Sequence, residues 1–174
     1  NEGSLYAAPQ MRINLSFGDT EKMATADVTI IDLLSYARIG VVEDKNWEEM
    51  NKNRDSTPQL VAEGIAISQR NEAVARQKRD AAGHPKAEAD LSTSIETVYG
   101  IRVTGSLFRF YAMLVSSEIH SAMKNQTAAV SPTTMYRYKD DDGLDFLVKE
   151  DRDEIIFMLS LLQEIAKRTD ESSP

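Results

Sequence analysis

Hydrophobic positions in the first part of the chain follow two different periods. Residues Met11–Phe17 alternate apolar and polar side chains, which is the pattern of a half-buried strand. Residues Ala26–Arg38 repeat apolar side chains at helical spacing, and Gly40 is well suited to end a helix. We therefore expect an extended arm or short strand within residues 1–24, followed by a helix.

The clearest helix start in the chain is Thr57-Pro58. Threonine is a good N-cap, and proline is tolerated at the first helical position because its missing N–H would be unpaired there. Apart from Gly64, no helix breaker follows until Gly83. The first half of this segment is apolar, whereas the half that begins at Ser68 has little but alanine to bury. The pattern predicts a long helix that is half buried and half protruding.

Three further helices are expected in the C-terminal half. The first is capped by Asp90 and carries Leu91, Ile95, Val98 and Tyr99. The second, Ser106–Lys124, is apolar nearly all round over Leu107–Val115, which is typical of a helix at the centre of a core. The third begins near Asp151 and carries an apolar stripe.

These patterns predict a mainly α fold, with five to six helices around one central apolar helix and an extended N-terminal arm or short strand. The expected organisation is an arm over residues 1–24, a helical domain over 25–169 and a frayed tail over 170–174. The length of 174 residues allows one domain with a real core, and 41% hydrophobic and 28% charged residues are ordinary for a globular protein.

Composition excludes several kinds of chemistry. The chain contains no cysteine and only two histidines, His84 and His120, so disulfides, thiolate metal sites and multi-histidine metal sites are excluded. Phosphate loops, dinucleotide fingerprints and zinc signatures are absent. No apolar stretch is long enough to span a membrane, and no signal peptide pattern is present. We expect no catalytic residue, metal or cofactor, no membrane contact, and a soluble protein in the cytoplasm.

The net charge of −8 conceals an uneven distribution. Residues 1–64 carry a net charge of −5, residues 65–139 a net charge of +4 and residues 140–174 a net charge of −7. A basic middle between acidic ends suits binding to a polyanion, or to the acidic end of a second copy.

Four basic residues, Arg70, Arg76, Lys78 and Arg79, lie on the weakly hydrophobic half of the long helix. Arginine forks suit phosphate oxygens, so these residues are candidates for contact with nucleic acid. The alternative is a solvated face with pairs within the helix, such as Glu72–Arg76.

Arg102 and Arg109 are the other candidates for nucleic-acid binding. Arg109 lies among aromatic residues in a segment that we expect to be buried, so it needs a carboxylate, a phosphate or an aromatic face. One interpretation is a structural ion pair with Asp145. The other is a phosphate ligand in a groove lined by Phe108 or Tyr111.

The one carboxylate cluster in the sequence is Asp140–Asp145. An EF-hand loop is rejected, because Tyr138 and Lys149 occupy positions that need acidic ligands. A solvated acidic turn is the favoured interpretation. A metal-dependent hydrolase that uses Asp140, Asp142 and Asp145 is an alternative.

Two segments resemble the coat proteins of flexible filamentous plant viruses. Ser106–Ala112 (SLFRFYA) and Leu144–Val148 (LDFLV) are similar to the Leu-Arg-x-Phe-x-x-Tyr-Ala helix and the Phe-Asp-Phe motif of that family, and Ala75–Gly83 is similar to a third stretch. The resemblance implies a helical core with extended arms that polymerises around single-stranded RNA in a virion. Arg76, Arg109 and Asp145 would be the matching positions.

We therefore expect a non-enzymatic structural or assembly subunit, which associates with itself and binds single-stranded nucleic acid through its basic middle. An adaptor or effector domain that binds another protein through its acidic C-terminal helix is an alternative. A partly exposed apolar stripe over Ile155–Ile165 in a monomer would favour the adaptor.

Overall fold

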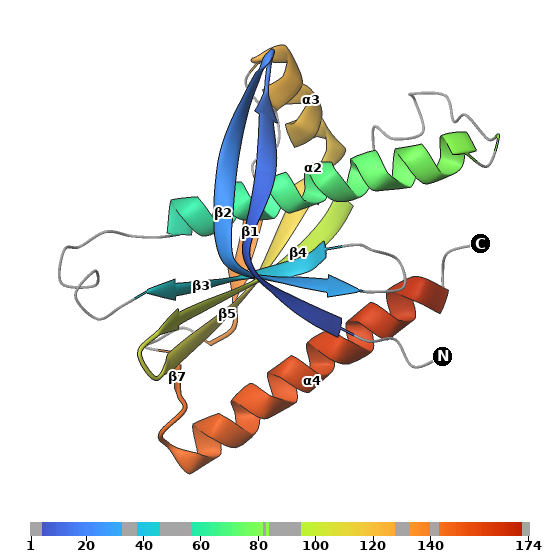
Figure 1. Ribbon diagram of the computed structural model, residues 1–174. Coiled ribbons are helices and arrows are strands. Elements are labelled where there is room, and N and C mark those ends of the chain that lie inside the picture. The colour runs from blue at the N-terminus through green and yellow to red at the C-terminus, as the bar shows by residue number, and fades with distance from the viewer. Residues whose placement is uncertain are drawn as a thin grey trace.

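The structure is a computed structural model and describes residues 5–32, 38–45, 57–81, 83, 95–127, 133–139 and 143–171. These residues form a mixed sheet of seven strands with three helices (Figure 1). The prediction of a mainly α fold with five to six helices is wrong.

The elements follow one another along the chain in a fixed order. They are β1 (Leu5–Phe17), β2 (Thr20–Asp32), β3 (Arg38–Lys45), α2 (Thr57–Ala81), β4 (Ile95–Thr104), β5 (Leu107–Ser116), α3 (Ser117–Asn125), β6 (Thr134–Arg137), β7 (Leu144–Asp145) and α4 (Lys149–Glu171).

The strand order in the sheet is β1-β2-β3-β4-β5-β6, and the short β7 also pairs with β5. Every pairing is antiparallel except β3 with β4, which is parallel. Parallel neighbours need a crossover connection, and the helix α2 lies within this one. The long hairpin of β1 and β2 reaches α3, where the N–H of Gly18 donates to the carbonyl of Met123 at 2.9 Å (Figure 1).

Each face of the sheet packs against one long helix, so there are two cores. The core on the α2 face includes Leu60, Ile67, Val98 and Met113. The core on the α4 face is built from Ile101, Phe110, Leu144, Ile155 and Leu162. Adjacent residues of one strand therefore serve different cores.

This double coverage explains the error at Leu107–Val115, which is strand β5 and not a central helix. A strand with both faces covered is apolar at nearly every position, and hydrophobic periodicity does not separate it from a buried helix. The helical core implied by the coat-protein resemblance placed its helix on the same segment, so the structure does not have that core. The resemblance itself stays a prediction.

Two other predicted helices are strands. Residues Ala26–Arg38 belong to the end of β2 and the start of β3 where they are described, and Gly40 lies inside β3. The segment expected to be a helix around Tyr99 is β4. Val28, Ile30 and Ile31 are β-branched residues that favour strands, and both faces of these strands are again partly covered.

Three predictions of elements are confirmed. Met11–Phe17 is a strand, although it is paired along its length with β2 in the central sheet. Helix α2 begins at Thr57, and α4 begins two residues before the expected Asp151. None of the helices in the described ranges is long and apolar enough to cross a membrane. The last tail residues, 172–174, lie outside the described ranges.

Candidate functional site

Two glutamates are buried together between the sheet and α2. Glu43 on β3 and Glu63 on α2 are each 1% exposed. The side-chain amide of Gln59 donates to Oε1 of Glu43 and to Oε1 of Glu63, both at 3.0 Å. Because Gln59 itself is exposed, the pair lies directly beneath the surface of the molecule.

The local structure brings these groups together. Gln59 and Glu63 are four residues apart on α2, so they share one face of the helix. Glu43 follows the buried Val41 by two residues, so both point to the α2 face of the sheet. At Gly64 a Cβ would lie 2.5 Å from Cε of Met113. The absence of a side chain there lets α2 approach the sheet next to Glu63.

Burial and like charge keep Glu63 protonated. The pKa of Glu63 is raised to about 8, first because burial disfavours its charged form and then because its side chain hydrogen-bonds with that of Glu43. The charges of Glu43 and Asp27 add to the effect, and the hydrogen bond from Gln59 opposes it. Two carboxyl groups can hydrogen-bond with each other only when one of them holds a proton. At neutral pH Glu63 therefore holds a proton.

Asp27 on β2 adds a third carboxylate to this face of the sheet. Val28 on β2 pairs with Val42 on β3. Because the two strands are antiparallel, Asp27 and Glu43 are the next neighbours in the same direction along the pair. Alternation places both on the face opposite that of Val28 and Val42. Strand register thus brings a third negative charge towards the pair.

Asp27 and Glu43 begin a row of charged side chains across the sheet, and two arginines continue this row. Glu43 is the partner of Arg102 in the pairing of β3 with β4, and Arg102 is the partner of Arg109 in the pairing of β4 with β5. Partner residues on adjacent strands point to the same face. Acidic groups on β2, β3 and α2 therefore lie beside guanidinium groups on β4 and β5.

Two fully buried hydroxyl groups lie on the strands around this row. Thr29 follows Asp27 by two residues, and Thr104 follows Arg102 by two residues; both are 0% exposed. Their Oγ1 atoms have no hydrogen-bond partner among the described residues. A buried polar atom without a partner is costly, and such atoms concentrate at sites with a further role.

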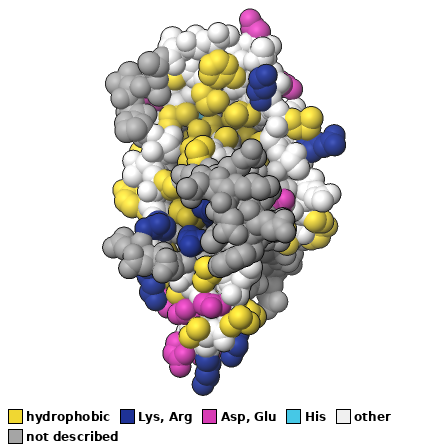
Figure 2. Space-filling model, turned by 90° about the vertical axis from the view of Figure 1, so that its left-hand side faces the viewer, with side chains coloured by type: hydrophobic (Ala, Val, Ile, Leu, Met, Phe, Trp, Pro, Cys, Tyr) yellow, Lys and Arg dark blue, Asp and Glu magenta, His cyan; other side chains and the backbone are white. Residues whose placement is uncertain are grey.

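Figure 2 faces the side of the molecule on which β3 ends and α2 begins. Lys and Arg side chains lie left of the centre of this face, with Asp and Glu side chains below them. Side chains of both signs of charge are thus accessible on this side of the molecule.

The buried pair suits a hard divalent cation in number and type of ligand. Within the described ranges no group of three or more His, Cys, Asp or Glu side chains is already arranged around one point. Magnesium, however, commonly binds one or two protein carboxylates and completes its shell with water and substrate phosphate. Glu43 and Glu63 supply the two carboxylates, and the amide oxygen of Gln59 is a further oxygen ligand.

No family model, curated protein or solved structure matches this chain. What the protein does is therefore inferred from its own geometry.

The structure separates the six predicted nucleic-acid-binding residues into two groups. Arg102 lies on the strand next to that of Glu43, and Arg109 lies one strand further on the same face. Arg70, Arg76, Lys78 and Arg79 lie on the outer half of α2, past its last buried residue, so the predicted half-buried and half-protruding helix is confirmed.

The alternative prediction for this half of α2, a pair within the helix, is present. Arg76 is 51% exposed and forms an ion pair with Glu72 at 2.9 Å. Glu72 also lies 2.7 Å from Nδ1 of His120. These contacts give the Arg76 side chain a partner within the protein.

Asp145 has hydrogen-bond partners other than Arg109, which was its predicted ion-pair partner. Its carboxylate accepts hydrogen bonds from the N–H of Leu147 and from the side chain of Ser106, and these bonds lower its pKa. The other two acids of the predicted metal site, Asp140 and Asp142, lie outside the described ranges. The structure therefore does not assemble that site within the residues it describes.

Four residues of this site were not predicted from the sequence: Asp27, Glu43, Gln59 and Glu63. Asp27 was hidden by the incorrect assignment of a helix to its segment. Glu63 did leave a signal, because it lies between the buried Leu60 and Ile67 at helical spacing, where a carboxylate has to be buried as well. Glu43 likewise follows two valines in what is now a covered strand.

Proposed function

We propose that Glu43 and Glu63 bind a divalent cation, Mg²⁺ or Mn²⁺, and that the protein hydrolyses a phosphodiester with it, with nucleic acid as the substrate class. The observation that carries this proposal is the burial of Glu43 and Glu63, each 1% exposed, at the side-chain amide of the one residue Gln59. This departs from the non-enzymatic role expected from the sequence.

Charge favours a cation at this pair. Two carboxyl groups that are each 1% exposed need compensation for their negative charge. In the protein alone, the proton retained by Glu63 lowers the charge of the pair. A divalent cation would displace the proton and compensate both charges, and the third charge of Asp27 would add to the attraction.

The neighbouring arginine side chains favour a phosphodiester as the substrate. Arg102 and Arg109 follow Glu43 on the same face of the sheet. Guanidinium groups match phosphate oxygens, and a phosphate held there would reach a cation at Glu43. The net charge of +4 over residues 65–139, which include both arginines, favours a polyanion and hence a nucleic acid.

The reaction needs no covalent intermediate with the protein. A water oxygen bonds to phosphorus, the ester P–O bond breaks, and the leaving oxygen gains a proton to replace the one that water loses. A cation held by Glu43 and Glu63 would polarise the phosphate and lower the pKa of the water.

The test is cleavage of labelled single-stranded and double-stranded DNA and RNA, with Mg²⁺, Mn²⁺ or a chelator. We expect cleavage that depends on the cation and that falls at least about 100-fold in both Glu43→Gln and Glu63→Gln. The matched control is Glu154→Gln, which removes a partly exposed carboxylate on α4 whose pKa is lowered by its bond to Lys139. Cleavage by the wild-type protein that survives Glu63→Gln would refute the proposal.

Substrate contacts are tested separately. Arg102→Gln and Arg109→Gln should raise KM more than they lower kcat, because phosphate contacts position the substrate. The alternative hydrolase site predicts the opposite pattern, with activity lost in Asp142→Asn and retained in Glu63→Gln. The assembly and adaptor roles stay proposals, and the observation that bears on them is the surface of α4.

A further inference from the structure

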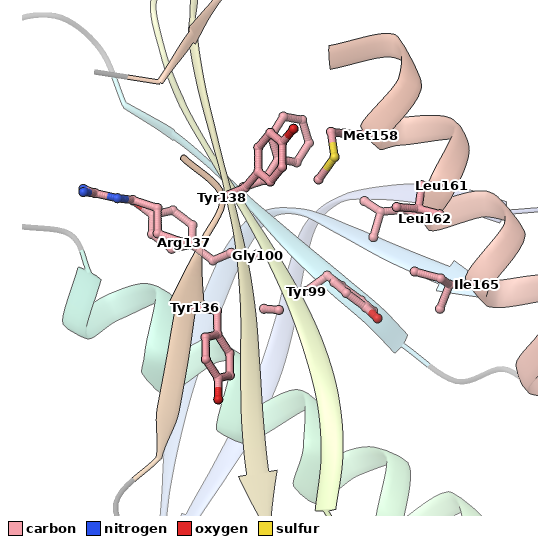
Figure 3. Close-up of a pocket in the computed structure, with 12 residues that line it drawn as sticks. Tyr99, Gly100, Tyr136, Arg137, Tyr138, Met158, Leu161, Leu162 and Ile165 are labelled. Carbon is pink, nitrogen blue, oxygen red and sulfur yellow. The ribbon is translucent and has the colours of Figure 1, made fainter. Parts of the chain in front are cut away.

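An apolar cavity of about 240 Å³ lies between the C-terminal half of α4 and strands β4, β5 and β6 (Figure 3). It lies on the face of the sheet that α4 covers, which is the face opposite to that of Glu43 and Glu63. The cavity is open to solvent on one side, and Leu161 and Tyr136 of its lining are 43% and 58% exposed. A small molecule therefore has a path into it.

The register of three strands creates this hollow. Tyr99 on β4 pairs with Ala112 on β5, and Ala112 pairs with Tyr136 on β6. Partner residues on adjacent strands point to the same face of the sheet, so a methyl group lies between two tyrosine side chains. Phe110, two residues before Ala112, is buried in the core under α4, which shows that this row faces α4. The small side chain of Ala112 thus leaves space beneath the helix.

Helix α4 closes the cavity from the other side with aliphatic side chains. Figure 3 shows Met158, Leu162 and Ile165 on α4, with Tyr99 across from them. Among the described residues that line the cavity only Arg137 is charged, and its guanidinium group points away from α4 (Figure 3). The interior is therefore apolar except for tyrosine hydroxyl groups.

The hydroxyl group of Tyr99 offers a ligand one hydrogen bond. The ring of Tyr99 packs against the core under α4, and its hydroxyl end lies towards Ile165 (Figure 3). Burial raises the pKa of Tyr99, and no hydrogen bond with a described side chain contributes to this shift. The hydroxyl group therefore keeps its proton at neutral pH. A polar group of this kind in an apolar cavity favours a ligand with one matching polar group.

We infer that this cavity binds a small aromatic molecule of two fused rings that carries one hydroxyl group, which bonds to Tyr99. The volume sets the size of the ligand, because an apolar cavity of about 150 Å³ is enough to bind benzene. The rings of Tyr99, Phe110 and Tyr136 favour an aromatic ligand, because aromatic rings attract each other edge to face and in offset stacks. This inference does not depend on the proposed hydrolase activity, whose site lies on the other face of the sheet.

The first test is equilibrium dialysis of 2-naphthol against the protein. We expect saturable binding at one site per chain, with a dissociation constant of about 100 µM or lower for a ligand of this size. Ala112→Leu fills the hollow between the two tyrosines and should weaken binding at least about 10-fold. The matched control is Ala7→Leu, which adds the same side chain at an exposed position of β1 and should bind like the wild-type protein. Circular dichroism confirms that both variants fold.

The second test isolates the hydrogen bond. Tyr99→Phe removes one hydroxyl group without changing the ring, and it should weaken binding of 2-naphthol about 3- to 10-fold. Binding of naphthalene, which has no hydroxyl group, should not change. The matched control is Tyr6→Phe on β1, where the side chain is 51% exposed, and it should affect neither ligand.

A third variant separates the cavity from the outer surface of α4. Phe157 is 62% exposed and does not line the cavity, so Phe157→Ser should bind 2-naphthol like the wild-type protein. Loss of binding in Phe157→Ser would place the ligand on that surface and overturn the inference. Absence of saturable binding to the wild-type protein, binding that survives Ala112→Leu, or an equal loss of both ligands in Tyr99→Phe would each overturn it as well. So would decanoate that displaces 2-naphthol and binds more tightly, because the cavity would then hold an acyl chain.

Discussion

The sheet carries one long helix on each face, and the two helices are packed in opposite ways. Under α2 the packing is close, with Leu60 and Ile67 almost fully buried, yet this interface encloses the carboxyl groups of Glu43 and Glu63. Under α4 every core residue is apolar, yet the packing leaves a cavity, and large apolar side chains of α4 such as Phe157 are exposed. The interface under α2 thus buries polar groups, and α4 exposes apolar groups. Both arrangements are normally unfavourable.

The comparison separates two kinds of cost. Burying two carboxyl groups together destabilises the chain. Such burial is retained where the carboxyl groups have a chemical role. Exposing a row of large side chains destabilises nothing within the chain but favours association. The first kind of cost points to a reaction site at α2, and the second to binding at α4.

The two faces of the sheet should differ most in the loss of stability when one buried leucine on each face is truncated to alanine. Leu60→Ala, at 1% exposure and against Gly100, should lower the free energy of unfolding by about 3–5 kcal/mol. Leu162→Ala, beside the existing cavity, should cost about 2–3 kcal/mol, because part of its surroundings is already empty. Urea unfolding measures both, and an equal or larger cost at Leu162 would contradict the difference in packing.

The sequence supports part of this picture and hides the rest. The start of α2, the position of α4 and the strand Met11–Phe17 follow from caps and periodicity, which are local signals. The centre of the sheet does not, because β5 is covered on both faces and loses the alternation that would mark a strand. Sequence periodicity alone therefore favours a helix at β5, where tertiary packing makes a strand that is covered on both faces.

The candidate site was hidden for a related reason. Its members are far apart in sequence, with Asp27, Glu43 and Glu63 on three different elements, and no short motif joins them. The register of β2 with β3 and the crossover through α2 bring them together. Arg102 and Arg109 were chosen from the sequence as candidates, but their proximity to Glu43 required the strand order.

The next largest effect is the pH dependence of stability. The folded pKa of Glu63, about 8, is above its ordinary value of 4.5. Between these values the folded protein holds a proton that the unfolded chain has released. The free energy of unfolding should therefore fall by about 1.4 kcal/mol for each pH unit in this interval. The stabilising contribution of Glu63 is fully present below pH 4.5 and is lost as the pH passes 8.

Glu63→Gln should remove this slope, since a neutral amide stays uncharged and can donate to Glu43 as the protonated acid does. Above pH 8 the variant should be more stable than the wild-type protein, as measured by urea unfolding between pH 5 and 9. Parallel curves for the two proteins would show that Glu63 does not hold the extra proton.

Two glycines allow α2 and β3 to approach their neighbours closely, and replacing them should have an intermediate effect on stability. A Cβ at Gly40 on β3 would lie 2.7 Å from the backbone oxygen of Tyr99, and one at Gly64 on α2 would lie 2.5 Å from the flexible end of Met113. Gly40→Ala should cost about 1–3 kcal/mol because the backbone has to move, and Gly64→Ala less than that. Thermal unfolding compares them, and the reverse order would mean that α2 is the more rigid neighbour.

The smallest effect is expected at Thr29. Replacing its buried hydroxyl group, which has no partner among the described residues, with a methyl group in Thr29→Val should leave stability unchanged or raise it by up to about 1 kcal/mol. The same variant should bind Mn²⁺ more weakly if the hydroxyl group orders water around the cation. A clear loss of stability would show that the hydroxyl group has a partner in solution.

The central claim is that Glu43 and Glu63 exchange the proton held by Glu63 for a divalent cation. Calorimetry of Mn²⁺ binding in buffers of different ionisation enthalpy counts the protons released. We predict nearly one proton per cation at pH 7, almost none at pH 9, and no binding in Glu63→Gln. Absence of binding in the wild-type protein, or binding that releases no proton at pH 7, would contradict the claim.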